Sequence, residues 1–281
     1  MTPKDILLHL RLPFSFFLMP VYWFAISQTP NWDKPKAIWI FVILHIFIYP
    51  ASNAYNSYFD KDEGSIGGLE KPPAVDKKLF WASWAIDILA VIISLFVLDW
   101  VFALMIFIYG LVSKAYSNDK IRLKKYPILS WFIVGFFQGA FTYFTIILVF
   151  EKNFDNLHGQ ILPAMISTMM LWAVYPMSQI YQHAEDAKRG DTTMSMLLGI
   201  TGTFFFTAIV FSIAFAGFFF YFNQADFLYL LIFNFPTLVF FGWWFVRVLK
   251  NSTQANFKNT MWLNLLASLC LNAFYIWLCV K

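Results

Sequence analysis

The sequence predicts an all-α integral membrane protein with nine transmembrane helices around a central cavity, formed by a single domain over residues 1–281. Of the 281 residues, 60 % are hydrophobic and 13 % are charged, whereas soluble domains are about 45–50 % apolar and about 25 % charged. Several uncharged stretches also reach the ~20 apolar residues that a membrane-crossing helix needs. These stretches are long and continuous, unlike the short alternating segments of membrane β-barrels.

The nine predicted spans follow one another along the chain. Seven are apolar runs without Asp, Glu, Lys or Arg: Leu12–Trp32, Ala37–Phe59, Pro127–Phe150, a run starting near Gln160, a helix within Met194–Tyr221, Phe227–Val246 and Asn259–Val280. The third span, Leu79–Leu98, is interrupted only by Asp87. The fourth begins at Trp100 and must extend toward Tyr116 to cross a bilayer.

The positive charges predict the orientation. With nine spans the termini lie on opposite faces, and all but four of the 20 Lys and Arg residues fall on the face of the amino terminus. The four exceptions are Lys34, Lys36, Lys152 and Lys281. By the positive-inside rule, the amino terminus and the even-numbered loops are expected in the cytoplasm. The net charge of +4 then fits contact with anionic lipid or an anionic substrate, and no nucleic-acid partner is expected. Without a transit-like leader, we expect a bacterial inner membrane.

A cluster of polar side chains ends the second span. Asn53, Asn56 and Asp60 recur at intervals that put them on one stripe of a helix. The carboxylates of Asp62 and Glu63 follow directly. Oxygen ligands suit hard cations, and Mg²⁺ is usually held by one or two carboxylates together with substrate phosphates.

The end of the sixth span repeats this pattern. Gln179, Gln182 and Asp186 are expected on one stripe of a continuing helix. Between the two clusters in sequence lies the most basic loop, Lys114 to Lys125, whose side chains can bind phosphate oxygens. Each cluster alone also fits helix caps or interface anchors, and the lysines also fit topology signals. Their recurrence on one membrane face favours a site for a lipid diphosphate.

Two more polar residues lie inside predicted spans. His45 is eight residues before Asn53 and therefore deeper on about the same stripe. It is expected either to contact a ligand or to form an interhelical hydrogen bond. Asp87 is a functional candidate, because a carboxylate in hydrocarbon is costly, or else it pairs with a neighbouring helix.

The order of these residues resembles the UbiA superfamily of intramembrane prenyltransferases over essentially the whole chain. The matching positions are Asn53 to Asp60, Lys71-Pro72, Tyr116-Ser117, Leu123-Lys124-Lys125, Gln182, Asp186, Gly190, Thr193 and Leu198-Gly199. Two family aspartates are replaced, one by Gly64 and one by Gln182. The metal site is therefore either rebuilt from nearby carboxylates or weakened.

The resemblance implies transfer of a prenyl group from a polyprenyl diphosphate to an aromatic or other lipophilic acceptor within the membrane. Mg²⁺ would be held by Asp60, Asp186, Asn56 and Asp62, and the first three of these would be catalytic. The residues expected to bind substrate are Asn53, Lys71, Tyr116, Arg122, Lys124, Gln182 and His45. Two alternatives stay open: an intramembrane terpene cyclase, and a noncatalytic lipid-binding or transport protein on the same fold.

Overall fold

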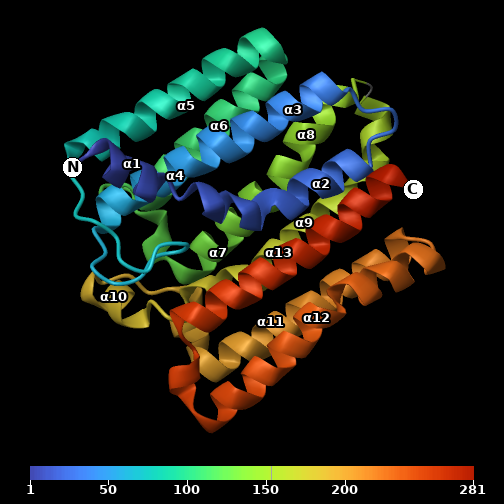
Figure 1. The fold of residues 1–281 in the computed structure, drawn as a ribbon. Coiled ribbons are helices and arrows are strands. Elements are labelled where there is room, and N and C mark those ends of the chain that lie inside the picture. Colours follow the sequence, from blue (N-terminus) through green and yellow to red (C-terminus); the bar gives the residue numbers. More distant parts are fainter. Residues whose placement is uncertain (153) are drawn as a thin grey trace. The chain divides into compact units, whose positions relative to one another are not determined.

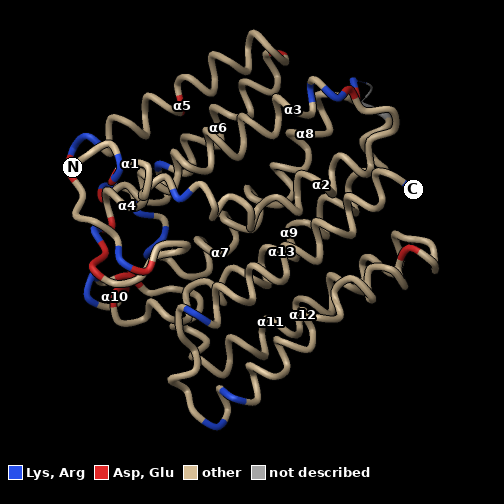
Figure 2. The backbone as a smooth tube through the Cα atoms, in the orientation of Figure 1, with Lys and Arg blue, Asp and Glu red and all other residues tan. Residues whose placement is uncertain are grey.

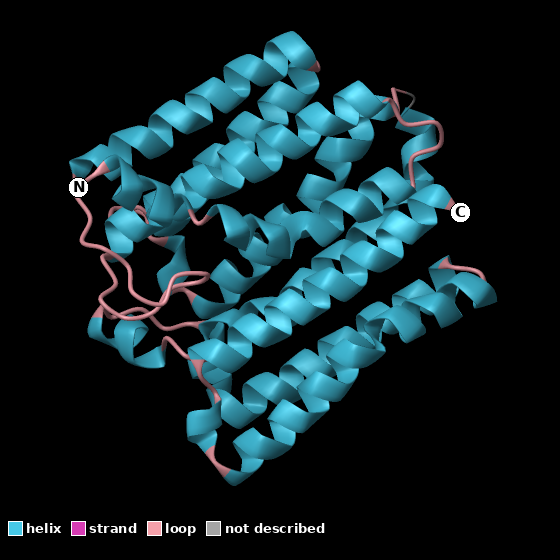
Figure 3. Ribbon diagram, viewed as in Figure 1, coloured by secondary structure: helices cyan, strands magenta, loops and turns pink. Residues whose placement is uncertain are grey.

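The computed structural model describes residues 1–152 and 154–281. In this part of the chain the regular structure is helical, and the only β-pairing is an isolated bridge between Ile66 and Leu69 (Figure 3). Nine of the described helices are long and apolar enough to cross a membrane, which confirms the predicted number. They are Pro3–Ser27, Lys34–Asp60, Lys77–Val97, Trp100–Ser117, Pro127–Phe150, Asn156–Gln179, Met194–Tyr221, Gln224–Lys250 and Phe257–Val280.

The chain divides into two compact units, and the first comprises residues 1–16, 29–124 and 145–152. Its complete helices are α1 (Pro3–Leu10), α3 (Lys34–Val42), η2 (Ile43–Ile48), α4 (Tyr49–Asp60), α5 (Lys77–Val97) and α6 (Trp100–Ser117) (Figure 1). Helix α4 packs against α1, α5 and α6. This unit therefore contains the predicted first motif together with the neighbours that surround it.

The second unit comprises residues 17–28, 125–144 and 153–281. Its complete helices are α2 (Met19–Ser27), α7 (Pro127–Phe136), η4 (Phe137–Phe141), α9 (Ile161–Gln179), α10 (His183–Lys188), α11 (Met194–Tyr221), α12 (Gln224–Lys250), η6 (Ser252–Gln254) and α13 (Phe257–Val280). Three short segments lie at the joins of the units: η1 (Leu12–Leu18), η3 (Leu123–Lys125) and α8 (Thr142–Phe150). The most extensive packing is between α9 and α11.

The second span is not a uniform α-helix. Residues Ile43–Ile48 form a π-helix, and α4 starts immediately after it with Pro50 in its first turn. Proline has no amide hydrogen, so the carbonyl that precedes it by four residues loses its helical partner. A widened π turn at this point accommodates that loss. The first motif therefore lies on a separate helical segment, which ends at Asp60.

Charged residues gather at helix ends and in loops (Figure 2). Asp87 and Lys114 are exceptions, since both lie within spans and are buried. Large apolar side chains such as Phe96 and Phe220 are 85 % and 79 % exposed. Exposed apolar helix faces of this kind are stable in lipid and costly in water.

Close packing of η4 on α9 depends on Gly139. A Cβ atom added to Gly139 would lie 2.5 Å from the Cα of Thr168, which is a steric clash. A glycine at this position lets the two helix backbones pack closely. We expect Gly139→Ala to destabilise the protein by about 1–3 kcal/mol through overpacking. Thermal unfolding in detergent measures this loss. Gly242→Ala is the matched control, because nothing lies within 4 Å of its added Cβ; an equal loss in both variants would contradict the packing argument.

Candidate active site

Asp60 ends α4 as a buried carboxylate, only 4 % exposed. The helix stops here because Lys61 adopts a left-handed conformation with φ 50°. One carboxylate oxygen, Oδ2, accepts a hydrogen bond of 2.8 Å from Nδ2 of Asn56. Asn56 lies one turn earlier on the same face, as the spacing of the motif predicts. The structure therefore brings together two of the predicted catalytic residues.

Two cations complete this cluster. Lys124 donates from Nζ to Oδ2 of Asp60 at 2.8 Å, and a guanidinium nitrogen of Arg122 lies 3.5 Å from Oδ1. Both cations are buried, at 7 % and 9 % exposed. Arg122 has a positive φ of 42° and also pairs with the exposed Asp119 at 2.9 Å. The cluster therefore joins one buried carboxylate to two buried cations. We call Asn56, Asp60, Arg122 and Lys124 the Asp60 cluster.

The end of α6 supports the Asp60 cluster through two residues without a predicted role in the site. Asn56 also donates to Oγ of Ser117 at 3.1 Å, and Asn118 donates to the hydroxyl of Tyr55 at 2.9 Å. These contacts join α4 to the end of α6, and Ser117 and Asp60 together orient the Asn56 amide. Ser117 lies within the matched Tyr116-Ser117 pair, which is the one sequence signal that points to it.

Asn53 faces another direction. Its side-chain amide donates to the Leu10 carbonyl at 3.3 Å, while its backbone carbonyl accepts from the Arg11 guanidinium at 3.2 Å. Arg11 is 8 % exposed and also donates to the Gly67 carbonyl at 3.3 Å. Arg11 therefore ties the amino-terminal segment to α4 and to the following loop. These contacts give Asn53 a structural role, and its contact with substrate stays a prediction.

The remaining predicted residues of the first unit differ in exposure. Lys71, a predicted substrate residue, is exposed on the loop after α4, whereas Tyr116 and the predicted metal ligand Asp62 are half-buried. His45 is 1 % exposed, and its Nδ1 lies 3.1 Å from the Ser15 carbonyl. Only an N–H can donate to a carbonyl, so Nδ1 carries the proton. This contact is the hydrogen bond between segments that was one of the two expectations for His45.

Lys114 was expected in the basic loop as a phosphate ligand, and this placement is wrong. It lies within α6, is 4 % exposed and forms an ion pair with Asp87 of α5. Its Nζ also lies over the rings of Tyr55 and Trp84, at 4.7 Å and 5.5 Å from their centroids. A charge within hydrocarbon needs a partner of opposite charge. The ion pair with Lys114 agrees with the expectation that Asp87 pairs with a neighbouring helix.

The predicted continuous stripe at the end of the sixth span is also wrong. Helix α9 ends at Gln179, the chain turns, and α10 starts at His183 with Gln182 as its amino-terminal cap residue. Asp186 therefore lies on a separate short helix. The polar pattern is compatible with an unbroken helix or with a turn, and hydrogen bonds decide between them. Oε1 of Gln179 accepts from the Ser195 amide at 3.4 Å, which links the end of α9 to the first turn of α11.

A hydrogen-bond chain joins α10 to a bend in α11. Nε2 of His183 is 2.8 Å from Oγ of Ser195, which is 3.1 Å from Oγ1 of Thr203. Thr203 donates to the Gly199 carbonyl at 2.7 Å. Gly199 has φ 68° and ψ 170°, which interrupts α11 and favours glycine. The Leu-Gly pair of the second motif is therefore a backbone bend that the neighbouring hydroxyls stabilise.

His183 gives this contact a pH dependence. Burial lowers its pKa below the usual 6.5, so the folded state favours the neutral ring. The neutral ring of His183 contributes fully to the free energy of unfolding above about pH 6.5. This contribution is lost as the pH falls toward the pKa of His183 in the folded protein. We expect the protection of amides around Ser195 against hydrogen exchange, relative to the intrinsic rate at each pH, to decrease as the pH falls below about 6.5, and this decrease to disappear in His183→Gln. An unchanged pH profile in that variant would contradict the assignment.

The side-chain oxygens of Asn56 and Asp60 are of the kind that bind Mg²⁺. The Asp60 cluster does not by itself supply a complete set of metal ligands. Among the described residues, no group of three or more His, Cys, Asp or Glu is arranged to hold a metal. Asp60 supplies one carboxylate, and its buried Oδ1 receives no hydrogen bond. These residues suit a Mg²⁺ ion that takes most of its ligands from diphosphate and water.

Nine apolar spans and a buried cluster of opposite charges at the end of one of them define the chain as a polytopic integral membrane protein. The UbiA prenyltransferase family matches it over residues 16–266. The chain belongs to the UbiA prenyltransferase family. No curated protein sequence matches it significantly.

Solved structures show the same fold. A UbiA homologue from Archaeoglobus fulgidus bound to GPP and Mg²⁺ is 12 % identical, with a TM-score of 0.71 over 99 % of this chain and 100 % of that one. One from Aeropyrum pernix is 16 % identical, with a TM-score of 0.65 over 94 % and 98 % of the two chains. A structure of digeranylgeranylglyceryl phosphate synthase is 17 % identical, with a TM-score of 0.61 over 99 % of each chain.

Proposed function

We propose that this protein transfers a prenyl group from a polyprenyl diphosphate to a lipophilic, aromatic acceptor within the membrane. The observation that supports the proposal is the Asp60 cluster, in which a buried carboxylate at the end of an apolar span pairs with two buried cations. A lipid diphosphate has a charged head on an apolar chain, so it matches such a boundary between polar and apolar surroundings. Membership of a family of prenyltransferases supports the same reaction.

The chemical difficulty is the cleavage of an allylic carbon–oxygen bond, which leaves a carbocation and a diphosphate. Arg122 and Lys124 can exchange Asp60 for phosphate oxygens and so stabilise the negative charge that develops on the leaving group. Asn56 holds Asp60 in place from the same helix. Exclusion of water by the apolar spans strengthens these interactions and protects the cation until the acceptor attacks.

We propose that Mg²⁺ is held by the four residues that the family resemblance implies as its ligands, Asp60, Asn56, Asp62 and Asp186. When bound, the ion neutralises charge on the leaving diphosphate. Structures of the Archaeoglobus fulgidus homologue contain GPP or DMAPP together with Mg²⁺, which supports this ion. Gln182, where the family has an aspartate, would offer an amide oxygen in place of a carboxylate.

We further propose that the site opens to the cytoplasmic face of a bacterial inner membrane. The excess of Lys and Arg on the face of the amino terminus supports this orientation. Lys71 would then approach the diphosphate from a cytoplasmic loop and Tyr116 from the end of α6, while His45 and Asn53 would lie deeper.

Incubation of the purified protein with labelled prenyl diphosphates, with and without Mg²⁺, tests the proposal. Prenyl transfer to an added phenolic acceptor supports it. A cyclised hydrocarbon would indicate a terpene cyclase, and unchanged substrate a noncatalytic lipid-binding or transport protein. Asp186→Ala is expected to abolish turnover, and retained activity in both this variant and an Asp60 variant would reject the metal site.

A further inference from the structure

The loop of residues 61–76, which follows α4 in the first unit, contains a tight turn. The backbones of Ile66 and Leu69 exchange two hydrogen bonds, at 2.9 Å and 2.8 Å, and Gly68 between them has a φ of 80°. Glycine adopts this conformation without a steric cost. Ile66 and Gly67 are buried. The loop is therefore folded and packs against another part of the first unit.

The amino-terminal segment provides the surface on which this turn packs. The ring of Phe14 lies so close that a Cβ atom added to Gly67 would be 2.5 Å from its Cε2 atom. Helix α1 ends just before Arg11, whose backbone is left-handed with φ 48°. The guanidinium of Arg11 donates to the Gly67 carbonyl at 3.3 Å and to the Asn53 carbonyl at 3.2 Å. One buried cation thus joins the loop to α4.

A second anchor lies further along the same loop. His9 is 1 % exposed, and its Nε2 lies 2.8 Å from the Pro73 carbonyl. A carbonyl only accepts, so Nε2 carries the proton and donates. Lys71 lies between the two anchored positions, four residues after Gly67 and two before Pro73, and its side chain is exposed. The backbone on both sides of this lysine is therefore held by the amino-terminal segment.

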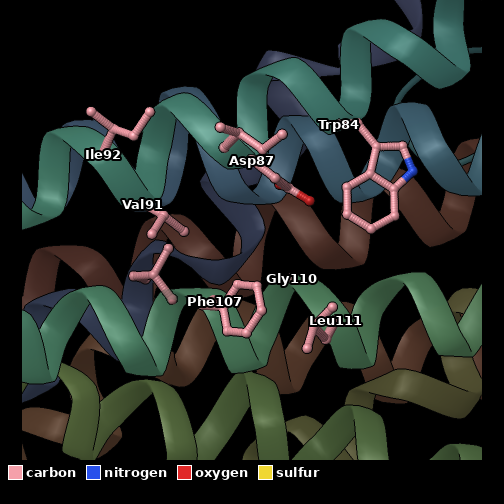
Figure 4. A pocket seen from close by; sticks show the side chains of 9 residues that line it. Trp84, Asp87, Val91, Ile92, Phe107, Gly110 and Leu111 are labelled. Atoms are coloured by element: carbon pink, nitrogen blue, oxygen red, sulfur yellow. The ribbon is translucent and has the colours of Figure 1, made fainter.

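The groove between α5 and α6 does not compete with this loop for an anion. It has a volume of about 250 Å³, and its walls are apolar apart from Asp87 (Figure 4). None of the nine described residues that line it is a cation, and Asp87 already pairs with Lys114. In the first unit, a diphosphate is therefore expected at the ends of the spans, where Asp60 and the loop with Lys71 lie.

We propose that His9 and Arg11 are positioning residues for this diphosphate. They hold the loop on both sides of Lys71, so that the lysine can meet phosphate oxygens while its backbone is already ordered. Ordering a loop on binding costs free energy, and a fixed loop avoids this cost. Both residues are buried with their donors on backbone carbonyls, which leaves the contact with substrate to Lys71. The inference rests on the proposed function, in which Lys71 approaches the diphosphate.

Equilibrium binding of an unreactive diphosphate tests the proposal. The probe is geranyl thiolodiphosphate, in which sulfur replaces the bridging oxygen, titrated with Mg²⁺ into the protein in lipid nanodiscs. We expect Lys71→Ala to raise its Kd about tenfold, because the variant removes a charge-assisted hydrogen bond. His9→Phe and Arg11→Met should each raise the Kd about fivefold and lower the protection of the loop amides against hydrogen exchange.

A double-mutant cycle separates positioning from a general loss of stability. If Arg11 acts through Lys71, Arg11→Met should change the Kd by less than about twofold once Lys71 is alanine. Effects that multiply would overturn the proposal, and so would a Kd unchanged by Arg11→Met. Gly67→Ala is the second variant, because its methyl group clashes with Phe14 and disturbs the same turn without removing a charge; it should act in the same direction. Gly139→Ala, which lowers overall stability, is the control and should leave the Kd unchanged.

Turnover of GPP by the same variants distinguishes this inference from the proposed function. A wild type that binds the analogue and shows the coupling, but transfers no prenyl group, would refute the proposed transfer and keep the positioning role. Prenyl transfer without coupling between Arg11 and Lys71 would refute the positioning role alone. A wild type that does not bind the analogue would refute both.

Discussion

Replacement of Asp60 by alanine is expected to lower prenyl transfer by about 10³-fold or more. Asp60 accepts from Asn56 and Lys124 and pairs with Arg122, so its loss removes one partner from each cation and the carboxylate proposed for Mg²⁺. Loss of a single group that stabilises transition-state charge costs about 10²–10³ in rate, and here several contacts depend on one side chain. Turnover of a labelled prenyl diphosphate with a phenolic acceptor measures the effect.

The loss must be separated from unfolding, since two buried cations lose their partner. Asp60→Asn keeps the shape and one acceptor oxygen, and it should remain folded while activity stays low. Asp99→Asn is the matched control, because Asp99 also pairs with a lysine, Lys152, at 2.7 Å but on a loop outside the Asp60 cluster. Activity near that of the wild type in folded Asp60→Ala would refute the central role of this carboxylate.

The second large effect is on stability. Lys114→Met leaves Asp87 as an uncompensated buried charge, and we expect a loss of about 3–5 kcal/mol in the free energy of unfolding. Lys114 also loses its contacts with the faces of two aromatic rings, each worth up to about 2 kcal/mol when desolvated. Equilibrium unfolding in detergent, followed by tryptophan fluorescence, measures the change.

The double variant Asp87→Leu with Lys114→Met provides the contrast. Replacement of a buried ion pair by apolar residues of similar volume is often neutral or stabilising, so most of the lost stability should return. A double variant as unstable as the single one would mean that the ion pair itself, and not the unpaired charge, carries the stability. Lys152→Met is the control, because its side chain is 60 % exposed and exposed pairs contribute about 0–1 kcal/mol.

The second span shows how far pattern alone reaches. The spacing of Asn56 and Asp60 predicts a shared helical face, and the hydrogen bond between them confirms it. The same reasoning fails for Gln182 and Asp186, because α9 ends at Gln179. Periodicity assumes that a helix continues, whereas continuation depends on contacts with other helices. At this end Gln179 accepts from the Ser195 amide of α11.

Lys114 and Lys124 show the same limit for charges. Both belong to one basic stretch and share a predicted role as phosphate ligands. In the structure Lys124 pairs with Asp60, whereas Lys114 pairs with Asp87, 27 residues away. The length that the fourth span needs places Lys114 inside a helix and Lys124 after it. The partner of each buried charge, however, is decided by which helix packs beside it.

The amino-acid order was sufficient for the number of spans, the family and the membrane environment. These follow from the length and hydrophobicity of each run, which are local quantities. The partners of the buried charges, the break after α9 and the groove beside Asp87 emerged only from the folded chain. Each of them depends on contacts between helices distant in sequence, and packing geometry in a low-dielectric interior selects those contacts.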